Sequence, residues 1–160
     1  MRFFYFIEMK KILMVCLGNI CRSPLAEGIL QSKLSSGLYE VDSAGTAGYH
    51  VGELPDKRSI QVANKYGIDI TNQRSRKFEK ADFDKFDMIF AMDKSNYDDI
   101  VTMSENSMQR EKVKMILSEQ FPDEAVNVPD PYYGGDQGFE NVYRMLDEVC
   151  TIIASKLENK

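Results

Sequence analysis

The chain alternates short apolar runs with longer amphipathic segments. Residues 11–17 (KILMVCL) are continuously apolar, which is typical of a strand buried on both faces of a parallel sheet. Further strands are predicted over residues 39–44, 88–92 and 112–116. Together these runs predict a sheet of four strands.

Between the predicted strands, apolar residues recur with the spacing of a helix. One helix is predicted from a first turn at Pro24 up to Gly37, and others over about residues 56–66 and 94–103. The last helix, from Phe139 onward, carries one apolar stripe made of Phe139, Val142, Tyr143, Leu146, Cys150, Ile153 and Leu157. Strands that alternate with helices through short connections imply right-handed crossovers. We therefore expect an α/β fold, a single three-layer domain with a central four-stranded parallel sheet flanked by helices on both faces.

The 160 residues suffice for one core, and we place a single domain at residues 9–160 behind an N-terminal extension, residues 1–8. The apolar run at residues 3–7 is too short to span a bilayer and lacks a cleavage site, so we reject a signal peptide. Two interpretations of the extension stay open: a frayed segment ahead of a natural start at Met9, or an added edge or docking segment.

Charge and cysteine content narrow the class of protein. A formal net charge of -5 disfavours a nucleic-acid-binding protein, so any anion site must be local. Three Cys are too few for a disulfide scaffold, and their odd number indicates a reducing compartment, the cytoplasm. Three scattered Cys and one His do not build a metal site.

The chemistry that the sequence suggests lies just after the first strand. Ligands bind at the carboxyl ends of strands in open α/β sheets, and this strand ends in the segment from Cys16 to Ser23 (CLGNICRS). If the five residues between Cys16 and Arg22 wrap into a loop, their N–H groups converge on one point beside a helix N-terminus. Such a loop would bind a tetrahedral dianion.

Each polar residue of this loop has a chemical use. The converging donors favour the thiolate form of Cys16, which makes it a nucleophile. Arg22 offers a planar fork for two phosphate oxygens, and Ser23 can donate a hydrogen bond to the leaving sulfur. Gly18 permits close approach of the backbone, and Asn19 tolerates a left-handed conformation.

The segment VCLGNICRSPLAEG resembles the active-site loop of the low-molecular-weight protein tyrosine phosphatases. Four further segments match the same family in order: DSAGT at 42–46, PD-x-R at 55–58, FAMD at 90–93 and DPYYGG at 130–135. The resemblance implies that residues 9–160 form the phosphatase domain. It also implies a phosphocysteine on Cys16, phosphate binding by Arg22 and protonation of the leaving phenol oxygen by Asp130. Chemistry requires such a proton donor independently, because an expelled phenoxide needs a proton.

The resemblance also implies the substrate-binding residues. Leu17, Gly18, Asn19, Ile20, Cys21 and Ser23 would form the phosphate-binding loop, and Ser43 would brace it through Asn19. Tyr49, Tyr132 and Tyr133, with Leu17, would wall a deep slot for an aromatic ring, which favours phosphotyrosine over the shorter phosphoserine. The expected partners are a phosphotyrosine-containing protein and, in the loop, inorganic phosphate or a similar oxyanion. We expect a monomer that uses no cofactor and no metal and binds neither nucleic acid nor membrane.

Several alternatives accompany this interpretation. Cys21 lies five residues after Cys16, and the resemblance supports a reversible, protective disulfide between them. Arsenate reductases of the same fold need two further cysteines near the middle of the chain, and residues 68–92 contain none. A binding module without catalysis would need neither thiol nor acid. A phosphatase that acts on phosphoarginine or a small metabolite remains an open alternative, because it would differ only in the shape of the slot that receives the substrate.

Overall fold

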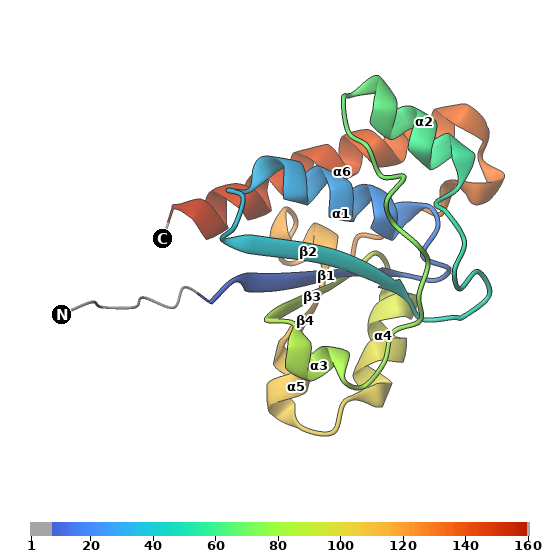
Figure 1. Cartoon of the computed structure of the whole chain (residues 1–160). Coiled ribbons are helices and arrows are strands. Elements are labelled where there is room, and N and C mark those ends of the chain that lie inside the picture. Colours follow the sequence, from blue (N-terminus) through green and yellow to red (C-terminus); the bar gives the residue numbers. More distant parts are fainter. Residues whose placement is uncertain (1–7, 160) are drawn as a thin grey trace.

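A parallel sheet of four strands forms the centre of the computed structural model, which describes residues 8–159 (Figure 1). The strands are β1 (Lys10–Cys16), β2 (Tyr39–Gly45), β3 (Met88–Ala91) and β4 (Val113–Met115), and their order in the sheet is β2-β1-β3-β4. Every neighbouring pair is parallel. All four carboxyl ends therefore meet at one edge of the sheet.

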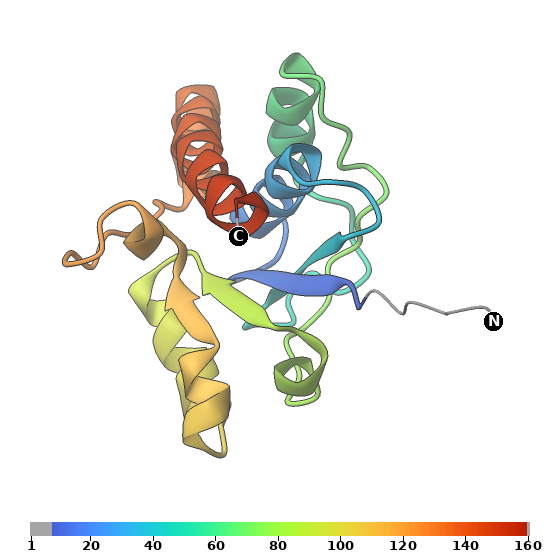
Figure 2. The ribbon, with the colours of Figure 1, turned by 90° about the vertical axis from the view of Figure 1, so that its left-hand side faces the viewer.

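Helices cover both faces of this sheet (Figures 1 and 2). One face carries α1 (Arg22–Lys33), α2 (Lys57–Lys65) and α6 (Gly135–Glu158), and the other carries α3 (Asp82–Lys85), α4 (Lys94–Met103) and α5 (Ser107–Glu111). Two short 3-10 helices are η1 (Ile116–Glu119) and η2 (Pro131–Tyr133). The predicted three-layer α/β fold is confirmed.

The central strand β1 explains why its sequence is apolar without interruption. Ile12 and Met14 belong to the core between the sheet and α1 and α6, whereas Leu13 and Val15 belong to the core on the opposite face. All four side chains are fully buried. Successive side chains of a strand point to opposite faces, so a strand covered on both sides needs apolar residues at every position.

The elements differ from the predicted ones mainly at their ends. α1 stops at Lys33, short of Gly37, because Leu34 already has extended backbone angles. β4 is only three residues long since Ile116 starts η1, and α6 begins at Gly135, one turn before Phe139. The helices α3 and α5, with four and five residues, were not predicted, because such short elements show no apolar stripe of helical period.

The predicted N-terminal extension, residues 1–8, lies outside the described residues except for Glu8, and β1 begins at Lys10. Within residues 8–159, no helix is both long and apolar enough to cross a membrane.

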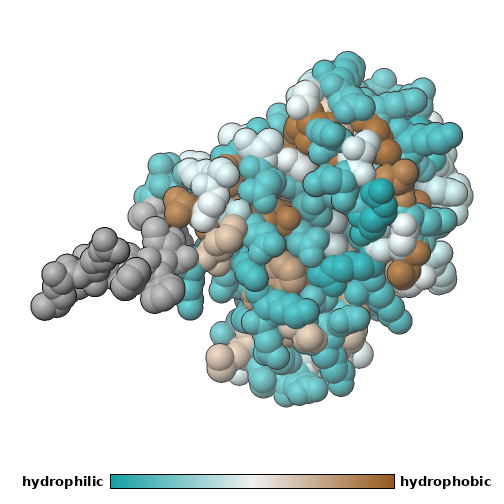
Figure 3. All heavy atoms as spheres, viewed as in Figure 1, coloured by the Kyte–Doolittle hydropathy of each residue, from teal (hydrophilic) through white to brown (hydrophobic). Residues whose placement is uncertain are grey.

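The face seen in Figure 3 is mainly hydrophilic, with small separate apolar patches over α2 and toward the edge where the strands end. Exposed apolar side chains near that edge include Leu17, Val51 and Leu54. Leu17 is the first residue after β1 and belongs to the loop that connects this strand to α1.

Candidate active site

The loop between β1 and α1 is held from outside through its carbonyl groups. Five of its carbonyl oxygens accept hydrogen bonds from other segments: Cys16 from Thr46 N at 2.9 Å, Leu17 from Ala47 N at 2.9 Å, Gly18 from Ser75 Oγ at 3.1 Å, Ile20 from Asp56 N at 2.8 Å and Cys21 from Ser59 Oγ at 3.3 Å. Carbonyls that point outward leave the N–H groups of the same peptides to face inward. The loop therefore has the form of an anion-binding nest at the N-terminus of α1.

Cys16 lies inside this nest, at the end of β1. Its Sγ accepts a hydrogen bond from Asn19 N at 3.3 Å and lies 3.0 Å from Ser23 Oγ. The loop reaches this geometry because Asn19 adopts a left-handed conformation with φ of 56°. Donors from two directions stabilise a negative charge on the sulfur.

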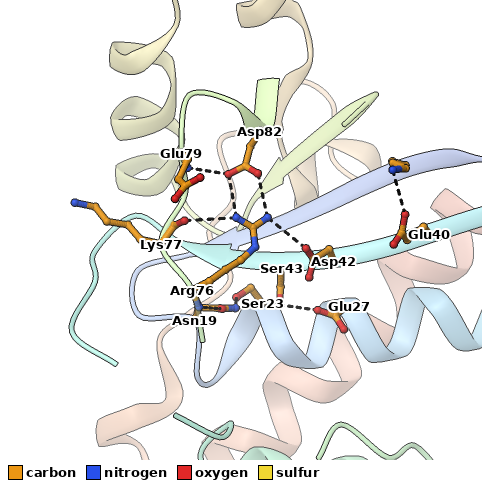
Figure 4. A network of polar contacts seen from close by, with 11 residues as sticks. Asn19, Ser23, Glu27, Glu40, Asp42, Ser43, Arg76, Lys77, Glu79 and Asp82 are labelled. Atoms are coloured by element: carbon orange, nitrogen blue, oxygen red, sulfur yellow. Dashed lines mark hydrogen bonds and ion pairs between the residues drawn. The ribbon is translucent and has the colours of Figure 1, made fainter. Parts of the chain in front are cut away.

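The side chain of Asn19 sets the direction of this hydrogen-bond network (Figure 4). Its Nδ2 donates to Ser23 Oγ at 2.8 Å and to Ser43 Oγ at 3.0 Å. An amide nitrogen only donates, so the hydroxyl hydrogen of Ser23 is left for the sulfur of Cys16. Asn19, Ser23 and Ser43 are buried behind the loop and do not line the pocket described below.

Arg76 supports Asn19 from the opposite side (Figure 4). Its backbone N–H donates to Asn19 Oδ1 at 3.0 Å. Its guanidinium binds both carboxylate oxygens of Asp82 at 3.1 Å and one of Asp42 at 3.3 Å. Burial lowers the pKa of Arg76, but the two carboxylates outweigh burial and raise it, so the residue stays charged. This ion network attaches the loop to β2 and α3.

Gly45, at the end of β2, lets the backbone of the loop pass close by. A Cβ atom there would lie 2.7 Å from the carbonyl oxygen of Leu17, well inside van der Waals contact. Any larger residue would therefore displace the loop.

Arg22 is 3% exposed, and its guanidinium is oriented by groups from two segments, one that contains Asp93 and one that contains Val128 and Asp130. Nη1 donates to Asp93 Oδ2 at 2.6 Å and to the carbonyl oxygen of Val128 at 3.0 Å, and Nη2 lies 3.9 Å from Asp130 Oδ2. Burial lowers the pKa of Arg22, but the negative charges of Cys16, Asp93 and Asp130 more than compensate and raise it. The guanidinium is thus a fixed positive charge beside the sulfur.

Asp130 stands at the start of η2, between two prolines. Its Oδ1 accepts a hydrogen bond from Tyr132 N at 3.0 Å, which caps η2, and its side chain is 43% exposed. The carboxylate lines the same pocket as Cys16 and Arg22. Chain folding has thus brought Asp130 to two groups, Cys16 and Arg22, that precede it by more than 100 positions in sequence.

The pocket has a volume of about 260 Å³ and contains most of the predicted substrate-binding residues. Its lining comprises Cys16, Leu17, Gly18, Ile20, Cys21, Arg22, Tyr49, His50, Asp130, Tyr132 and Tyr133. Tyr49 and Tyr133 are largely exposed, and Tyr132 is about half exposed, so the aromatic side chains surround the entrance. The pocket is polar at its base and aromatic at its rim.

Sequence reasoning missed four residues of this region: Asp93, Arg76, Glu27 and His50. Asp93 follows β3 directly, at the sheet edge where ligands bind, and this position was a usable signal. His50 lines the pocket, with Nδ1 at 2.5 Å from Glu53 Oε2. Arg76 and Glu27 carried no signal, because their partners are distant in sequence.

The other two thiols differ from Cys16 in environment. Cys21 lines the pocket, and burial, reinforced by Asp56, raises its pKa to about 12, so it is protonated at neutral pH. Cys150 is fully buried in α6, and burial raises its pKa to about 12 as well. All three cysteines are free in the structure. Within residues 8–159, no group of three or more His, Cys, Asp or Glu side chains is arranged to hold a metal ion.

Glu27 ends the hydrogen-bond network behind the loop. Its Oε1 accepts from Ser43 Oγ at 2.7 Å. Burial raises its pKa from 4.5 to about 7, with Asp42 acting in the same direction and Ser43 and Arg76 against it. A carboxylate that titrates near neutral pH therefore sits two hydrogen bonds from Asn19.

Replacing Glu27 with Gln should stabilise the protein relative to wild type as the pH rises. Between 4.5 and 7 the folded wild type holds a proton that the unfolded chain has released, so its stability falls with increasing pH. The accumulated loss amounts to at most about 3 kcal/mol. Gln keeps an acceptor for Ser43 but cannot ionise. Urea unfolding at about pH 5 and pH 8 measures the difference, with Glu40→Gln, an exposed carboxylate on β2, as control. Parallel pH profiles for wild type and Glu27→Gln would contradict the assignment.

The chain is similar to proteins of one family over nearly its whole length. The family model of the low molecular weight phosphotyrosine protein phosphatases matches residues 11–160. The chain is 41% identical to the low molecular weight phosphotyrosine protein phosphatase of Schizosaccharomyces pombe, over 85% of this chain and 89% of that protein. Among solved structures, a protein tyrosine phosphatase from Entamoeba histolytica with Hepes in its active site superimposes with a TM-score of 0.87 at 37% identity, covering 94% of this chain and 97% of that one. The tyrosine phosphatase Wzb from Escherichia coli K30 in complex with sulphate gives a TM-score of 0.82 at 30% identity, covering 94% and 99%.

Proposed function

Because the chain belongs to the low molecular weight phosphotyrosine protein phosphatase family, we propose that it hydrolyses phosphotyrosine in proteins through a phosphocysteine on Cys16. In this mechanism Arg22 binds the phosphate and Asp130 is the general acid and base. One observation carries the proposal: a hydrogen-bonded thiol and a buried guanidinium of one loop line a single pocket together with a carboxylate from a distant segment.

In the first step the sulfur of Cys16 attacks phosphorus. The S–P bond forms as the bond from phosphorus to the phenolic oxygen breaks, and Asp130 transfers its proton to that oxygen. The charge that develops on the phosphate oxygens is stabilised by the inward N–H groups and by Arg22, which Asp93 and Val128 hold in place. These donors are fixed before the substrate arrives, so little reorganisation is needed.

In the second step water hydrolyses the phosphocysteine. Asp130, now a carboxylate, takes a proton from the water as its oxygen attacks phosphorus, and the S–P bond breaks. Inorganic phosphate leaves and Cys16 returns to the thiolate. The hydroxyl of Ser23, 3.0 Å from the sulfur, stabilises that thiolate as a leaving group.

The shape of the pocket supports an aromatic substrate. The polar base of the pocket, with Arg22 and the nest, suits an oxyanion. Two relatives agree with this: Wzb was solved in complex with sulphate, and the Entamoeba phosphatase has Hepes in its active site. Tyr49, Tyr132 and Tyr133 stand around the entrance, where they can contact the ring of a phosphotyrosine. Phosphotyrosine places its phosphorus far enough from the peptide backbone to reach the base past these side chains.

Four further features are part of the proposal. The phosphatase domain spans residues 9–160, and the protein acts in the cytoplasm as a monomer. Ser43 braces the phosphate-binding loop through Asn19. A disulfide between Cys16 and Cys21, which line one pocket, protects the nucleophile from further oxidation. Peptide mass mapping after mild peroxide treatment checks the disulfide.

Parallel assays with four substrates test the proposal. We expect kcat/KM for a phosphotyrosine peptide to exceed that for the matching phosphoserine peptide by at least about 100-fold. Phosphoserine has no aromatic ring and cannot contact the tyrosines at the entrance of the pocket. The phosphoarginine peptide and arsenate reduction are the other two assays. Preferential turnover of phosphoarginine, or thiol-dependent reduction of arsenate, would replace the proposed substrate. Phosphate binding without turnover of any substrate would leave only a binding module.

A further inference from the structure

Arg58 is a charged residue in the first turn of α2 that the proposed mechanism does not use. Its guanidinium lies against two aromatic rings, with Cζ 5.5 Å from the centroid of Tyr132 and 4.5 Å from that of Phe139. Phe139 is buried in α6, whereas Tyr132 belongs to η2 at the rim of the pocket and is 42% exposed. The guanidinium therefore connects a pocket wall to the core of the protein.

The other side of the guanidinium is bound to Asp56. Arg58 Nε and Nη2 each lie 3.2 Å from a carboxylate oxygen of Asp56, and the same carboxylate accepts the backbone N–H of Arg58 at 2.9 Å. The backbone N–H of Asp56 in turn donates to the carbonyl oxygen of Ile20 at 2.8 Å. Arg58 is thus attached, through one residue, to the phosphate-binding loop.

The chain of contacts continues across the pocket to the general acid. The backbone N–H of Tyr132 donates to Asp130 Oδ1 at 3.0 Å, so the backbone that carries the ring of Tyr132 also holds the carboxylate of Asp130. The contacts run in order from Ile20 through Asp56, Arg58 and Tyr132 to Asp130. Of these five residues, only Arg58 uses its side chain for both of its contacts, with Asp56 toward the loop and with Tyr132 at the rim.

We propose that Arg58 is a positioning residue that holds Tyr132 and Asp130 over the phosphate-binding loop and thereby favours phosphate carried on an aromatic ring. Only a guanidinium can do both tasks, since its edge pairs with two carboxylate oxygens while its faces stack on rings. A lysine would supply charge at a single point. The inference rests on the proposed phosphatase function and adds a determinant of substrate choice to it.

Arg58→Lys and Arg58→Ala test this inference against three probes. The phosphotyrosine peptide needs both the aromatic wall and the acid, acetyl phosphate has no ring and a good leaving group, and inorganic phosphate reports the loop alone. We expect Arg58→Lys to lower kcat/KM for the peptide by roughly tenfold, the effect of losing a stacked cation, with a rise in KM. The kcat/KM for acetyl phosphate reports only formation of the phosphocysteine, and its good leaving group needs no proton from Asp130. This kcat/KM and the inhibition by inorganic phosphate should therefore stay within about twofold of wild type, because the loop is intact.

A double-mutant cycle with Tyr132→Leu separates positioning from a general structural role. If Arg58 acts through Tyr132, Arg58→Lys should have little further effect in the Tyr132→Leu protein. Lys57→Ala, which removes an exposed charge from the same helical turn, is the matched control and should behave as wild type. If Arg58→Ala does not fold, Arg58→Lys and the cycle still decide the question.

Two results would overturn the inference: equal loss with all three probes, or additive effects of Arg58→Lys and Tyr132→Leu. Unchanged selectivity of Arg58→Lys in an enzyme that hydrolyses phosphotyrosine would also overturn it and leave the proposed function intact. A wild-type protein that does not hydrolyse phosphotyrosine would instead overturn the proposed function, so the two failures are distinguishable.

Discussion

Replacing Cys16 with Ser is expected to abolish turnover of phosphotyrosine, with a loss of roughly 10⁴-fold or more in kcat, the order that removal of a nucleophile costs. A serine hydroxyl is not ionised at neutral pH. The two groups that contact the sulfur of Cys16 are the N–H of Asn19 and the hydroxyl of Ser23, and both act as hydrogen-bond donors in the proposed mechanism. No base is therefore placed to activate the hydroxyl.

Phosphate binding should survive the same substitution. The carbonyl bonds that shape the loop and the bonds of Arg22 to Asp93 and Val128 do not involve the sulfur. The serine also lacks the negative charge that opposes a bound dianion, so inorganic phosphate should bind as tightly as in wild type or more tightly. Steady-state assays and calorimetry with inorganic phosphate measure the two quantities.

Cys150→Ala is the control for the loss of a cysteine. Cys150 is fully buried in α6 and away from the pocket, so this variant should keep its activity and lose only some stability from the cavity. Continued release of phosphate by Cys16→Ser at the wild-type rate would exclude Cys16 as the nucleophile.

Replacing Asp130 with Asn should reduce kcat/KM by about 10²- to 10³-fold for substrates with poor leaving groups, the usual contribution of a general acid. Asn cannot supply the proton, but its Oδ1 can still accept the hydrogen bond from Tyr132 N, so η2 keeps its cap. Arg22 keeps its two closer partners, Asp93 and Val128. The substitution therefore removes the proton and leaves the phosphate site in place.

A series of aryl phosphates with increasingly acidic phenols measures this effect. The loss in kcat/KM should shrink as the phenol becomes more acidic, since a good leaving group needs no proton in the first step. Hydrolysis of the phosphocysteine is common to all these substrates and does not enter kcat/KM. Asp136→Asn, an exposed carboxylate in the first turn of α6, is the matched control and should show wild-type rates throughout the series. An equal loss for all phenols, or an equal loss of phosphate binding, would remove Asp130 from the acid role.

The fold could be predicted because its signals are local. A strand buried on both faces must be apolar at every position, as at residues 12–15, and a helix on one face of a sheet shows a single stripe, as in α6. The short elements α3, α5 and η2 carry no such period, and their positions depend on contacts such as that of Asp82 with Arg76. The order of the strands likewise depends on how the layers pack.

The candidate site divides in the same way. Cys16, Arg22 and Ser23 lie in one loop, so their spacing in the sequence already constrains their geometry, and Asp130 was found through a motif that matched a family. Asp93, Arg76 and Glu27 act through partners that lie 71, 57 and 16 positions away. Asp93 could have been noticed from its place directly after a predicted strand, but nothing in a local segment distinguishes Arg76 and Glu27 from the other charged residues of the chain.

The amino-acid sequence alone determined the classes of element, the loop after β1 and the chemical groups available in it, since these follow from residue types and from spacings within one turn or strand. Only the tertiary structure decided which carboxylate orients Arg22, which amide and hydroxyl groups surround the sulfur from behind, and how Arg58 links the loop to the aromatic rim. The physical reason is that hydrogen bonds and ion pairs act over about 3 to 4 Å in space. Segments that are far apart in the chain come within this range only because the two hydrophobic cores pack helices and loops against the two faces of the sheet.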